Sequence, residues 1–269
     1  MLLLIFSLLS IGLSFLTYYI AGFFNQSPWF LFLLLTFFVG YLAVIVAIYW
    51  FGLAIISLPY KGKEPKKVNR FFLFNVKLLA SFVLFINMIF VKKKNFKMIP
   101  KEPGLILFNH ISNFDFMAIY KTMKGRYAFI GKKELMKAPM TGQLTSAIGT
   151  LFVDRKNPES GRVMVDNAVE YITEKNASIV IAPEGTRSHT GIIAPFKHGG
   201  FHIALRSKCP ITLLVLKNIE KTGQRKFIKP VKVEVVILEV IKPEFYENMS
   251  AGELALYCEN KYKEFLHQL

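Results

Sequence analysis

The chain has 269 residues, of which 53% are hydrophobic, and its mean hydropathy of +0.38 is too high for an ordinary soluble domain. Its formal charge of +16 indicates an anionic partner, which leaves nucleic acid, anionic lipid headgroups and phosphorylated substrates. No Asp, Glu, Lys or Arg occurs before Lys61. Because the charges are separate from the most apolar part, we expect membrane lipid as a partner and no nucleic acid.

Two apolar runs open the chain, near residues 2–24 and 28–57, with the polar turn "NQSPW" between them. Each is long enough to cross a bilayer, which needs about 20 apolar residues. We predict a transmembrane helical hairpin over residues 1–60. The basic segment "KGKEPKKVNR" follows directly and is typical of the cytoplasmic side, so we expect an integral membrane protein whose remaining part faces the cytosol.

A third apolar run, 71–91, allows two interpretations. Its length would permit a further span, which would put the rest of the chain on the opposite side. It also contains Asn75, Lys77 and Asn87 and has lysines on both sides. Flanking positive charge at both ends favours a helix lying in the membrane interface. We therefore predict a basic linker with an interfacial helix over residues 61–98.

Short apolar strands alternate with helical patterns from residue 99 to the end of the chain. This alternation predicts an α/β domain over 99–269, with a mixed sheet covered by helices. Ser250 and Glu253 predict a capping box at the start of the last helix. The cysteines, Cys209 and Cys258, are too few and too far apart for a disulfide framework, which agrees with a reducing environment.

The stretch "NHISNFD" places His110 and Asp115 directly after the predicted strand "GLILF". A zinc site needs three or four ligands, and no further His or Cys cluster accompanies the pair. Ser112 and Asp115 resemble a helix cap, which explains the Asp and not the His. A third interpretation is a general base, His110, whose ring is held by the Asp115 carboxylate; it rests on the position of the pair at a strand end, and the spacing alone is a weak signal for it.

Three more polar clusters follow predicted strands, where ligands of open α/β sheets bind. In "PEGTRS", Gly185 would let the backbone approach a ligand, and the Arg187 guanidinium suits phosphate. Thr186 and Ser188 add hydroxyl groups. Arg155 ends "GTLFVDR", and two lysines begin "GKKEL". Taken singly, these clusters are typical of turns and surface ion pairs. The candidate binding residues are Lys132, Lys133, Arg155, Glu184, Gly185, Thr186, Arg187 and Ser188.

Together the clusters resemble the PlsC-like glycerolipid acyltransferases, most closely the 1-acylglycerol-3-phosphate (lysophosphatidate) acyltransferases. "NHISNFD", "GTLFVDR" and "PEGTRS" match three family blocks in order and spacing, and "APFKHGGFHIA" is similar to the next segment. The likeness covers roughly residues 100–216. The segments "CPITLLVL" and "FKHGGF" depart from the family pattern, and this bears on the acceptor more than on the reaction.

The resemblance implies the glycerolipid acyltransferase fold and transfer of a fatty acyl chain from acyl-CoA or acyl-carrier protein to the 2-hydroxyl of 1-acylglycerol 3-phosphate. No cofactor is implied besides this co-substrate. It assigns catalysis to His110 and Asp115, and contact with the glycerol part of the acceptor to Glu184. The phosphate would be held by cations, namely Arg155, Arg187 and one of Lys132 or Lys133.

Other functions remain open from the sequence. A related enzyme would acylate glycerol 3-phosphate or another lysophospholipid. A membrane-anchored lipid-binding or scaffold protein would use the basic segment 61–70 and would not need His110 and Asp115.

Overall fold

The computed structural model describes residues 2–21, 30–65, 67–188, 193–224 and 229–267. The chain divides into two compact units, Met1–Pro59 and Tyr60–Leu269. This division lies beside the predicted boundary at residue 60. The predicted polar turn at 25–29 and Lys66 of the basic segment lie outside the described residues.

The first unit contains two apolar helices, α1 (Leu2–Ile20) and α2 (Phe30–Ile56). They pack on each other through Phe6 and Tyr49, whose rings are 5.4 Å apart, and through the hydroxyls of Thr17 and Tyr41, 2.6 Å apart. Among the described helices, only the 26 residues Leu31–Ile56 are long and apolar enough to cross a membrane. The predicted transmembrane hairpin therefore stays a prediction, with α2 meeting the length and composition of a span.

The second unit begins with helix α3 (Arg70–Ile86), which is amphipathic and packed on the domain. Phe72, Leu73 and Leu84 are buried, while Phe71 and Phe74 are about half exposed. The helix ends at Ile86, so the predicted helix 71–91 was too long. With 17 residues it measures about 25 Å, less than a bilayer core of about 30 Å.

A mixed seven-stranded sheet forms the centre of this unit, in the order β1-β7-β6-β2-β5-β3-β4. The five strands from β2 to β6 all run parallel to one another. Strand β7 is antiparallel to its neighbour β6. The predicted mixed α/β sheet is therefore confirmed. The strands are β1 (Ile89–Lys94), β2 (Leu105–Phe108), β3 (Tyr127–Lys132), β4 (Leu151–Val153), β5 (Ser178–Ile181), β6 (Ile211–Lys217) and β7 (Val231–Ile241).

Strand β1 corrects the predicted domain boundary at residue 99. It pairs in parallel with β7, with Ile89 opposite Val231 and Lys94 opposite Val236. Met88, with φ of 53°, separates it from α3. Locally, residues 89–91 continue an apolar run, and their partner strand lies about 140 residues further on, so the sequence pattern concealed the change from helix to strand.

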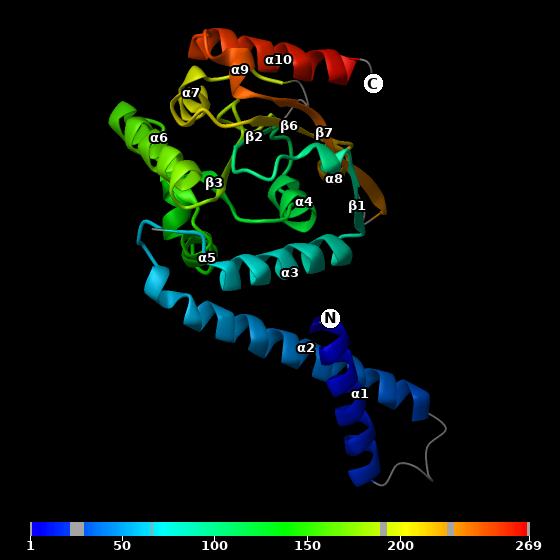
Figure 1. Ribbon diagram of the computed structural model, residues 1–269. Coiled ribbons are helices and arrows are strands. Elements are labelled where there is room, and N and C mark those ends of the chain that lie inside the picture. Colours follow the sequence, from blue (N-terminus) through cyan, green and yellow to red (C-terminus); the bar gives the residue numbers. More distant parts are fainter. Residues whose placement is uncertain (1, 22–29, 66, 189–192, 225–228, 268–269) are drawn as a thin grey trace. The chain divides into compact units, whose positions relative to one another are not determined.

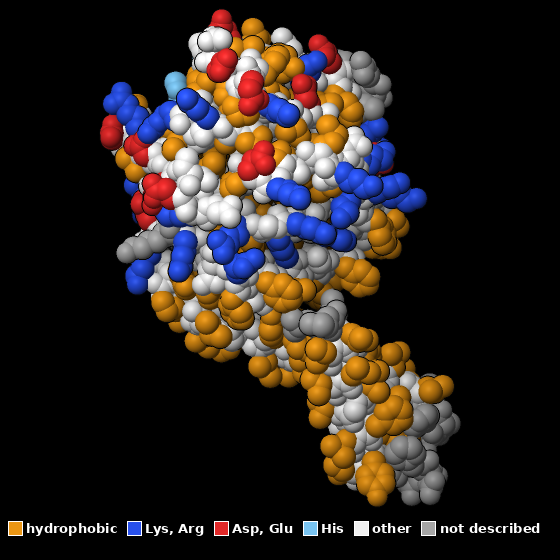
Figure 2. Space-filling model, in the orientation of Figure 1, with side chains coloured by type: hydrophobic (Ala, Val, Ile, Leu, Met, Phe, Trp, Pro, Cys, Tyr) orange, Lys and Arg blue, Asp and Glu red, His pale blue; other side chains and the backbone are white. Residues whose placement is uncertain are grey.

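Helices cover both faces of the sheet. In the view of Figure 1, α7, α9 and α10 lie above it and α4 and α3 below it. The α-helices after α3 are α4 (Asp115–Thr122), α5 (Thr141–Ala147), α6 (Pro158–Thr173), α7 (His202–Ser207), α8 (Lys221–Gln224), α9 (Pro243–Tyr246) and α10 (Ala251–His267). Short 3-10 helices are η2 (Leu58–Tyr60), η3 (Phe96–Met98), η4 (Lys133–Lys137) and η5 (His198–Phe201). Figure 2 shows Lys and Arg side chains gathered over the visible face of the second unit.

Local sequence explains where two of these helices begin. At α10, the Ser250 amide donates to Glu253 Oε2 (2.7 Å) and the Glu253 amide donates to Ser250 Oγ (3.2 Å), so the predicted capping box is confirmed. At α6, Asn157 Oδ1 accepts from the Glu159 amide, and Pro158 occupies the first turn, where its missing N–H costs nothing.

Strand β2 lies at the centre of the core, and all four of its residues are buried. Its first hydrogen bond joins the Leu105 amide to the Pro210 carbonyl at 3.0 Å. From α10, the buried Tyr262 hydroxyl reaches the Leu107 carbonyl at 2.7 Å. Polar contacts inside an apolar core thus join β2 to α10 and to the residue that precedes β6.

Gly104 permits the start of β2 to lie close to the Pro210 carbonyl, and a substitution there tests how much this packing contributes to stability. A Cβ atom at this position would lie 2.3 Å from the Pro210 carbonyl oxygen, which is backbone and cannot rotate away. We expect Gly104→Ala to lower the free energy of unfolding by about 1–3 kcal/mol, measured by denaturant unfolding of the detergent-solubilised protein. Gly161→Ala, in α6 with open space around the new methyl, should leave stability equal or slightly higher. Equal effects of the two changes would contradict this explanation.

Candidate active site

The predicted polar clusters meet at one edge of the sheet. His110 follows β2, Lys132 ends β3, Arg155 follows β4 and Gly185 follows β5. Because these strands are parallel, their carboxyl ends lie at the same edge. Segments up to 75 residues apart in the chain therefore contribute to one site.

Asn109 fixes the point at which β2 gives way to this site. Its buried side chain replaces a backbone partner: Oδ1 accepts from the Leu216 amide (2.8 Å) and Nδ2 donates to the Leu216 carbonyl (3.2 Å). The chain is thus held against β6 while it turns out of the sheet. The next residue, His110, is positioned by this anchor.

His110 and Asp115 form the predicted pair. Nδ1 of His110 lies 2.7 Å from Oδ2 of Asp115. The same oxygen accepts from the amides of Ile111 (2.8 Å) and Ser112 (2.9 Å), and Ser112 Oγ accepts from the Phe114 amide (3.2 Å). The predicted contact between ring and carboxylate is therefore present, whereas α4 begins after Phe114 without a side-chain cap, so only the Ser112 amide bond of the expected cap is formed. With Nδ1 donating to the carboxylate, Nε2 is the nitrogen available to a substrate.

Burial and hydrogen bonding act in opposite directions on Asp115. The residue is fully buried, and this desolvation raises the pKa of its carboxyl group. The contacts with His110, Ser112 and Ile111 favour the ionised form and offset this effect only in part, so the pKa of Asp115 stays raised. The carboxylate is best suited to a neighbouring imidazolium, which would compensate its buried charge.

Glu184 is bonded to backbone amides on two sides of the site. Its Oε1 accepts from the His110 amide and its Oε2 from the Ala194 amide, both at 3.0 Å, and the residue is only 2% exposed. Burial raises the pKa of this carboxyl group. Each oxygen accepts from a backbone amide, and the predicted contact with the glycerol part of an acceptor stays a prediction. Glu184 holds together the turn of His110 and the segment at Ala194.

Gly185 brings Lys197 over the same turn. Its φ is +72°, and a Cβ atom there would lie 2.9 Å from Cδ and Cε of Lys197. Both the backbone conformation and the lysine stem therefore favour glycine. The Lys197 amide donates to the Pro183 carbonyl at 2.9 Å, which fixes the start of its side chain.

His110 lines a pocket of about 780 Å³ whose walls include both cationic and apolar side chains. Five Lys or Arg side chains and one carboxylate, Asp154, line it. The cations are Lys132, Arg155, Arg162, Lys197 and Arg206. The apolar lining includes Phe108, Phe116, Ile130, Leu135, Val153, Met164, Val165 and Ile181. Such a pocket suits an anionic amphiphile.

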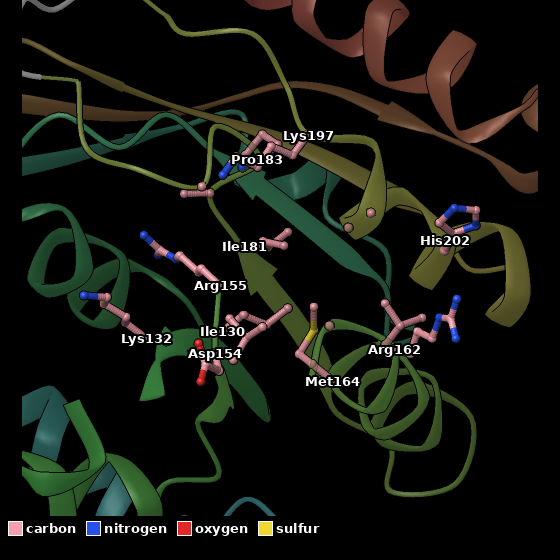
Figure 3. A pocket seen from close by; sticks show the side chains of 18 of the residues that line it. Ile130, Lys132, Asp154, Arg155, Arg162, Met164, Ile181, Pro183, Lys197 and His202 are labelled. Carbon is pink, nitrogen blue, oxygen red and sulfur yellow. The ribbon is translucent and has the colours of Figure 1, made fainter. Parts of the chain in front are cut away.

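The charges occupy two ends of this pocket. Figure 3 shows the cationic ends of Lys132 and Arg155 on one side of the view. On the opposite side are Arg162 and His202, and Ile130, Ile181 and Met164 lie between the two ends. An anion and an apolar chain thus have separate surroundings within one cavity.

Not every predicted binding residue lines this pocket. Lys132, Arg155 and Gly185 do, whereas Lys133 begins η4 outside it. Arg187 donates to Asn113 Oδ1 and lines a neighbouring depression of about 310 Å³. Thr186 is exposed, and Ser188 contributes its amide to the His110 carbonyl at 2.8 Å. The structure therefore separates Arg187 from the pocket of His110.

Four basic residues of the pocket were absent from the sequence-based set: Arg162, Lys197, His202 and Arg206. Lys197 and His202 lie in "APFKHGGFHIA", whose likeness to a family block was a usable signal. Arg162 and Arg206 form ion pairs with Glu159 (3.5 Å) and Asp166 (2.6 Å). Their place in the pocket depends on how α6 packs against α7, which sequence spacing does not reveal.

Comparison with known proteins agrees with this arrangement. Residues 90–217 match the family described as Acyltransferase. The chain is 28% identical over 148 residues to 1-acyl-sn-glycerol-3-phosphate acyltransferase alpha of Mus musculus, covering 54% of this chain and 52% of that protein. It is 30% identical over 161 residues to 1-acyl-sn-glycerol-3-phosphate acyltransferase of Haemophilus influenzae, covering 60% and 67%. The chain thus spans about half the length of the mouse relative.

The fold is that of a solved acyltransferase. The crystal structure of the 1-acyl-sn-glycerophosphate (LPA) acyltransferase PlsC from Thermotoga maritima superposes with a TM-score of 0.60 at 23% identity, covering 73% of this chain and 78% of that one. The chain has an acyltransferase-type α/β fold with a His-Asp pair at the carboxyl edge of its sheet. It belongs to the PlsC-like family of 1-acylglycerol-3-phosphate acyltransferases.

The backbone role of Glu184 is testable by truncation. Glu184→Ala would leave the amides of His110 and Ala194 without their carboxylate, so we expect the free energy of unfolding to fall by about 2–4 kcal/mol. Denaturant unfolding measures this, and Glu102→Ala, at an exposed carboxylate, is the matched control with a change within about 0.5 kcal/mol. Unchanged stability together with a raised acceptor KM would instead favour direct substrate contact.

Proposed function

We propose that this protein transfers a fatty acyl chain from a thioester donor to the 2-hydroxyl of 1-acylglycerol 3-phosphate, giving phosphatidic acid. The observation that carries the proposal is the His110–Asp115 pair at the mouth of a pocket with cationic and apolar walls. The names of the relatives from mouse and Haemophilus influenzae support the same acceptor. A non-catalytic lipid binder would have no use for an oriented imidazole.

His110 acts as the general base in this proposal. Its Nε2 takes the proton of the acceptor hydroxyl as that oxygen attacks the thioester carbonyl carbon. Asp115 keeps the proton on Nδ1 and stabilises the imidazolium that forms. The C–S bond then breaks, and the departing thiolate receives the proton from His110. One C–O bond replaces one C–S bond, and no acyl-enzyme is required because the thioester is already activated.

The cationic end of the pocket binds the acceptor phosphate. Arg155 offers a planar set of donors, and Lys132 and Lys197 add point charges. A phosphate held there restrains the glycerol, and this lowers the entropic cost of bringing its hydroxyl to Nε2. The apolar lining accommodates fatty chain carbons. The site residues thus assigned to the acceptor are fewer than the sequence suggested and include Lys197.

The donor and the location complete the proposal. The donor is acyl-CoA or acyl-carrier protein, both of which present the same thioester, and no other cofactor takes part. The protein is anchored through α2, with the site on the cytosolic side, since the basic segment 61–70 follows the apolar unit directly. The acceptor is a lipid of the cytosolic leaflet.

His110→Ala tests the base. We expect the transfer rate to fall by roughly 10²–10⁴-fold, the usual contribution of a positioned general base, while membrane association stays unchanged. The assay follows labelled acyl transfer in membranes with acyl-CoA and acyl-carrier protein donors and a panel of acceptors including glycerol 3-phosphate. His198→Ala, an exposed histidine outside the pocket lining, is the control and should keep near-normal rates. Near-normal turnover of His110→Ala would end the proposed mechanism.

A comparison of two arginines tests the phosphate site. Arg155 lines the pocket of His110, whereas Arg187 bonds to Asn113 beside it. We expect Arg155→Ala to raise the acceptor KM by about tenfold or more, since a charge-assisted bond contributes roughly 1.5–3 kcal/mol. Arg187→Ala should raise it less. If Arg187→Ala raised the acceptor KM more than Arg155→Ala, the phosphate site would instead be the depression at Arg187.

A further inference from the structure

A second cleft, of about 820 Å³, lies where strands β2, β3 and β5 begin. Because these strands are parallel, this amino-edge cleft is at the opposite edge of the sheet from His110. The residues that line it are all different from those that line the catalytic pocket. It is therefore a separate feature of the second unit.

The amino-edge cleft has a strong excess of positive charge. Its cationic lining residues are Arg70, Lys93, Lys97, Lys101, Lys124 and Arg126. One carboxylate, Glu102, lines it as well. Within the described part of the chain, none of the six cations forms an ion pair with a carboxylate. Like charges gathered without counter-charges favour the binding of an anion between them.

The backbone around these cations is firmly held. The Met123 carbonyl accepts from Nζ of Lys77 at 3.0 Å, and the Arg126 carbonyl accepts from the Ser178 amide at 3.0 Å. Ser178 Oγ in turn accepts from the Gly104 amide at 3.2 Å. The turn that bears Lys124 and Arg126 is thus tied to α3 and to the sheet, so the cleft exists before a ligand arrives.

Exposed apolar side chains adjoin the cations in the chain. Phe71 is 55% exposed and Phe74 51% exposed, on the helix that begins at Arg70. Met98, next to Lys97, is 46% exposed. A soluble anion would make no use of these side chains. The surface of an anionic bilayer offers phosphate to the cations and acyl chains to the aromatic rings.

We propose that the amino-edge cleft binds the phosphate headgroups of anionic membrane phospholipids, at a site separate from the one where acyl transfer takes place. The cleft and the exposed residues of α3 then dock one side of the second unit on the membrane surface. This proposal does not depend on the reaction, because no residue of the cleft belongs to the catalytic pocket.

A dye in the cleft provides a local readout. Glu102→Cys places one thiol there, and Cys209 and Cys258 are buried, so an environment-sensitive maleimide dye marks the cleft in the full-length protein. The labelled protein is placed in nanodiscs of phosphatidylcholine containing increasing fractions of phosphatidylglycerol. We expect the dye signal to change with the phosphatidylglycerol fraction and to stay constant in phosphatidylcholine alone.

Matched charge variants test the cations. The variant Lys97→Gln, Lys101→Gln, Lys124→Gln removes three exposed cleft lysines, and Lys208→Gln, Lys232→Gln, Lys242→Gln removes three exposed lysines elsewhere. A basic residue at an anionic surface contributes roughly fivefold in binding. We expect the first variant to reduce the dye response at least threefold and the second to leave it unchanged. The corresponding Lys→Arg triple variant should retain the response.

Equal responses of the two Gln variants would overturn the proposal, as would equal responses to phosphatidylglycerol and phosphatidylcholine. Inorganic phosphate at millimolar concentration is tested in phosphatidylcholine nanodiscs, and a full response there would identify a soluble-anion site instead. A full response to a single-stranded oligonucleotide would identify a nucleic-acid site. In the cleft variant, acyl transfer to an acceptor in neutral detergent should stay within twofold of the parent protein.

Discussion

One carboxylate oxygen organises the candidate site. Oδ2 of Asp115 lies within 2.9 Å of three nitrogens, which belong to the His110 ring and to the amides of Ile111 and Ser112. The carboxylate of the first residue of α4 thus holds both the turn that precedes the helix and the imidazole ring. Because the carboxylate is fully buried, the loss of one of these partners would leave a charge poorly compensated.

A second level of support comes from carboxylates that bind backbone. Glu184 joins the turn of His110 to the Ala194 amide, and Glu259 on α10 accepts from the Phe196 amide at 2.8 Å. These bonds hold the segment that carries Lys197 across Gly185. Glu184 of the motif and Glu259 of α10 thus fix the backbone around the site, and Lys197 on the segment between them lines the pocket. This division fits an electrostatic site that is organised before substrate arrives.

Each of two opposite edges of the sheet carries a group of Lys and Arg side chains. The carboxyl edge holds the pocket with its apolar interior, and the amino edge holds the open cleft beside the exposed aromatic residues of α3. We propose that the carboxyl edge binds the reacting lipid and that the amino edge binds the surrounding membrane. The sheet separates the two, so the charges that dock the protein need not compete with those that hold the acceptor.

The sequence by itself determined the alternating strands, the apolar first unit, the His110–Asp115 pair and the family, because these depend on local periodicity and on motif order. The tertiary structure alone decided which charged residues share a pocket. It placed Lys197 beside Gly185 and Arg187 beside Asn113, and it occupied Glu184 with backbone amides. It also made residues 89–94 a strand. These outcomes depend on partners far along the chain, and pairing between distant segments leaves no periodic trace in the residues themselves.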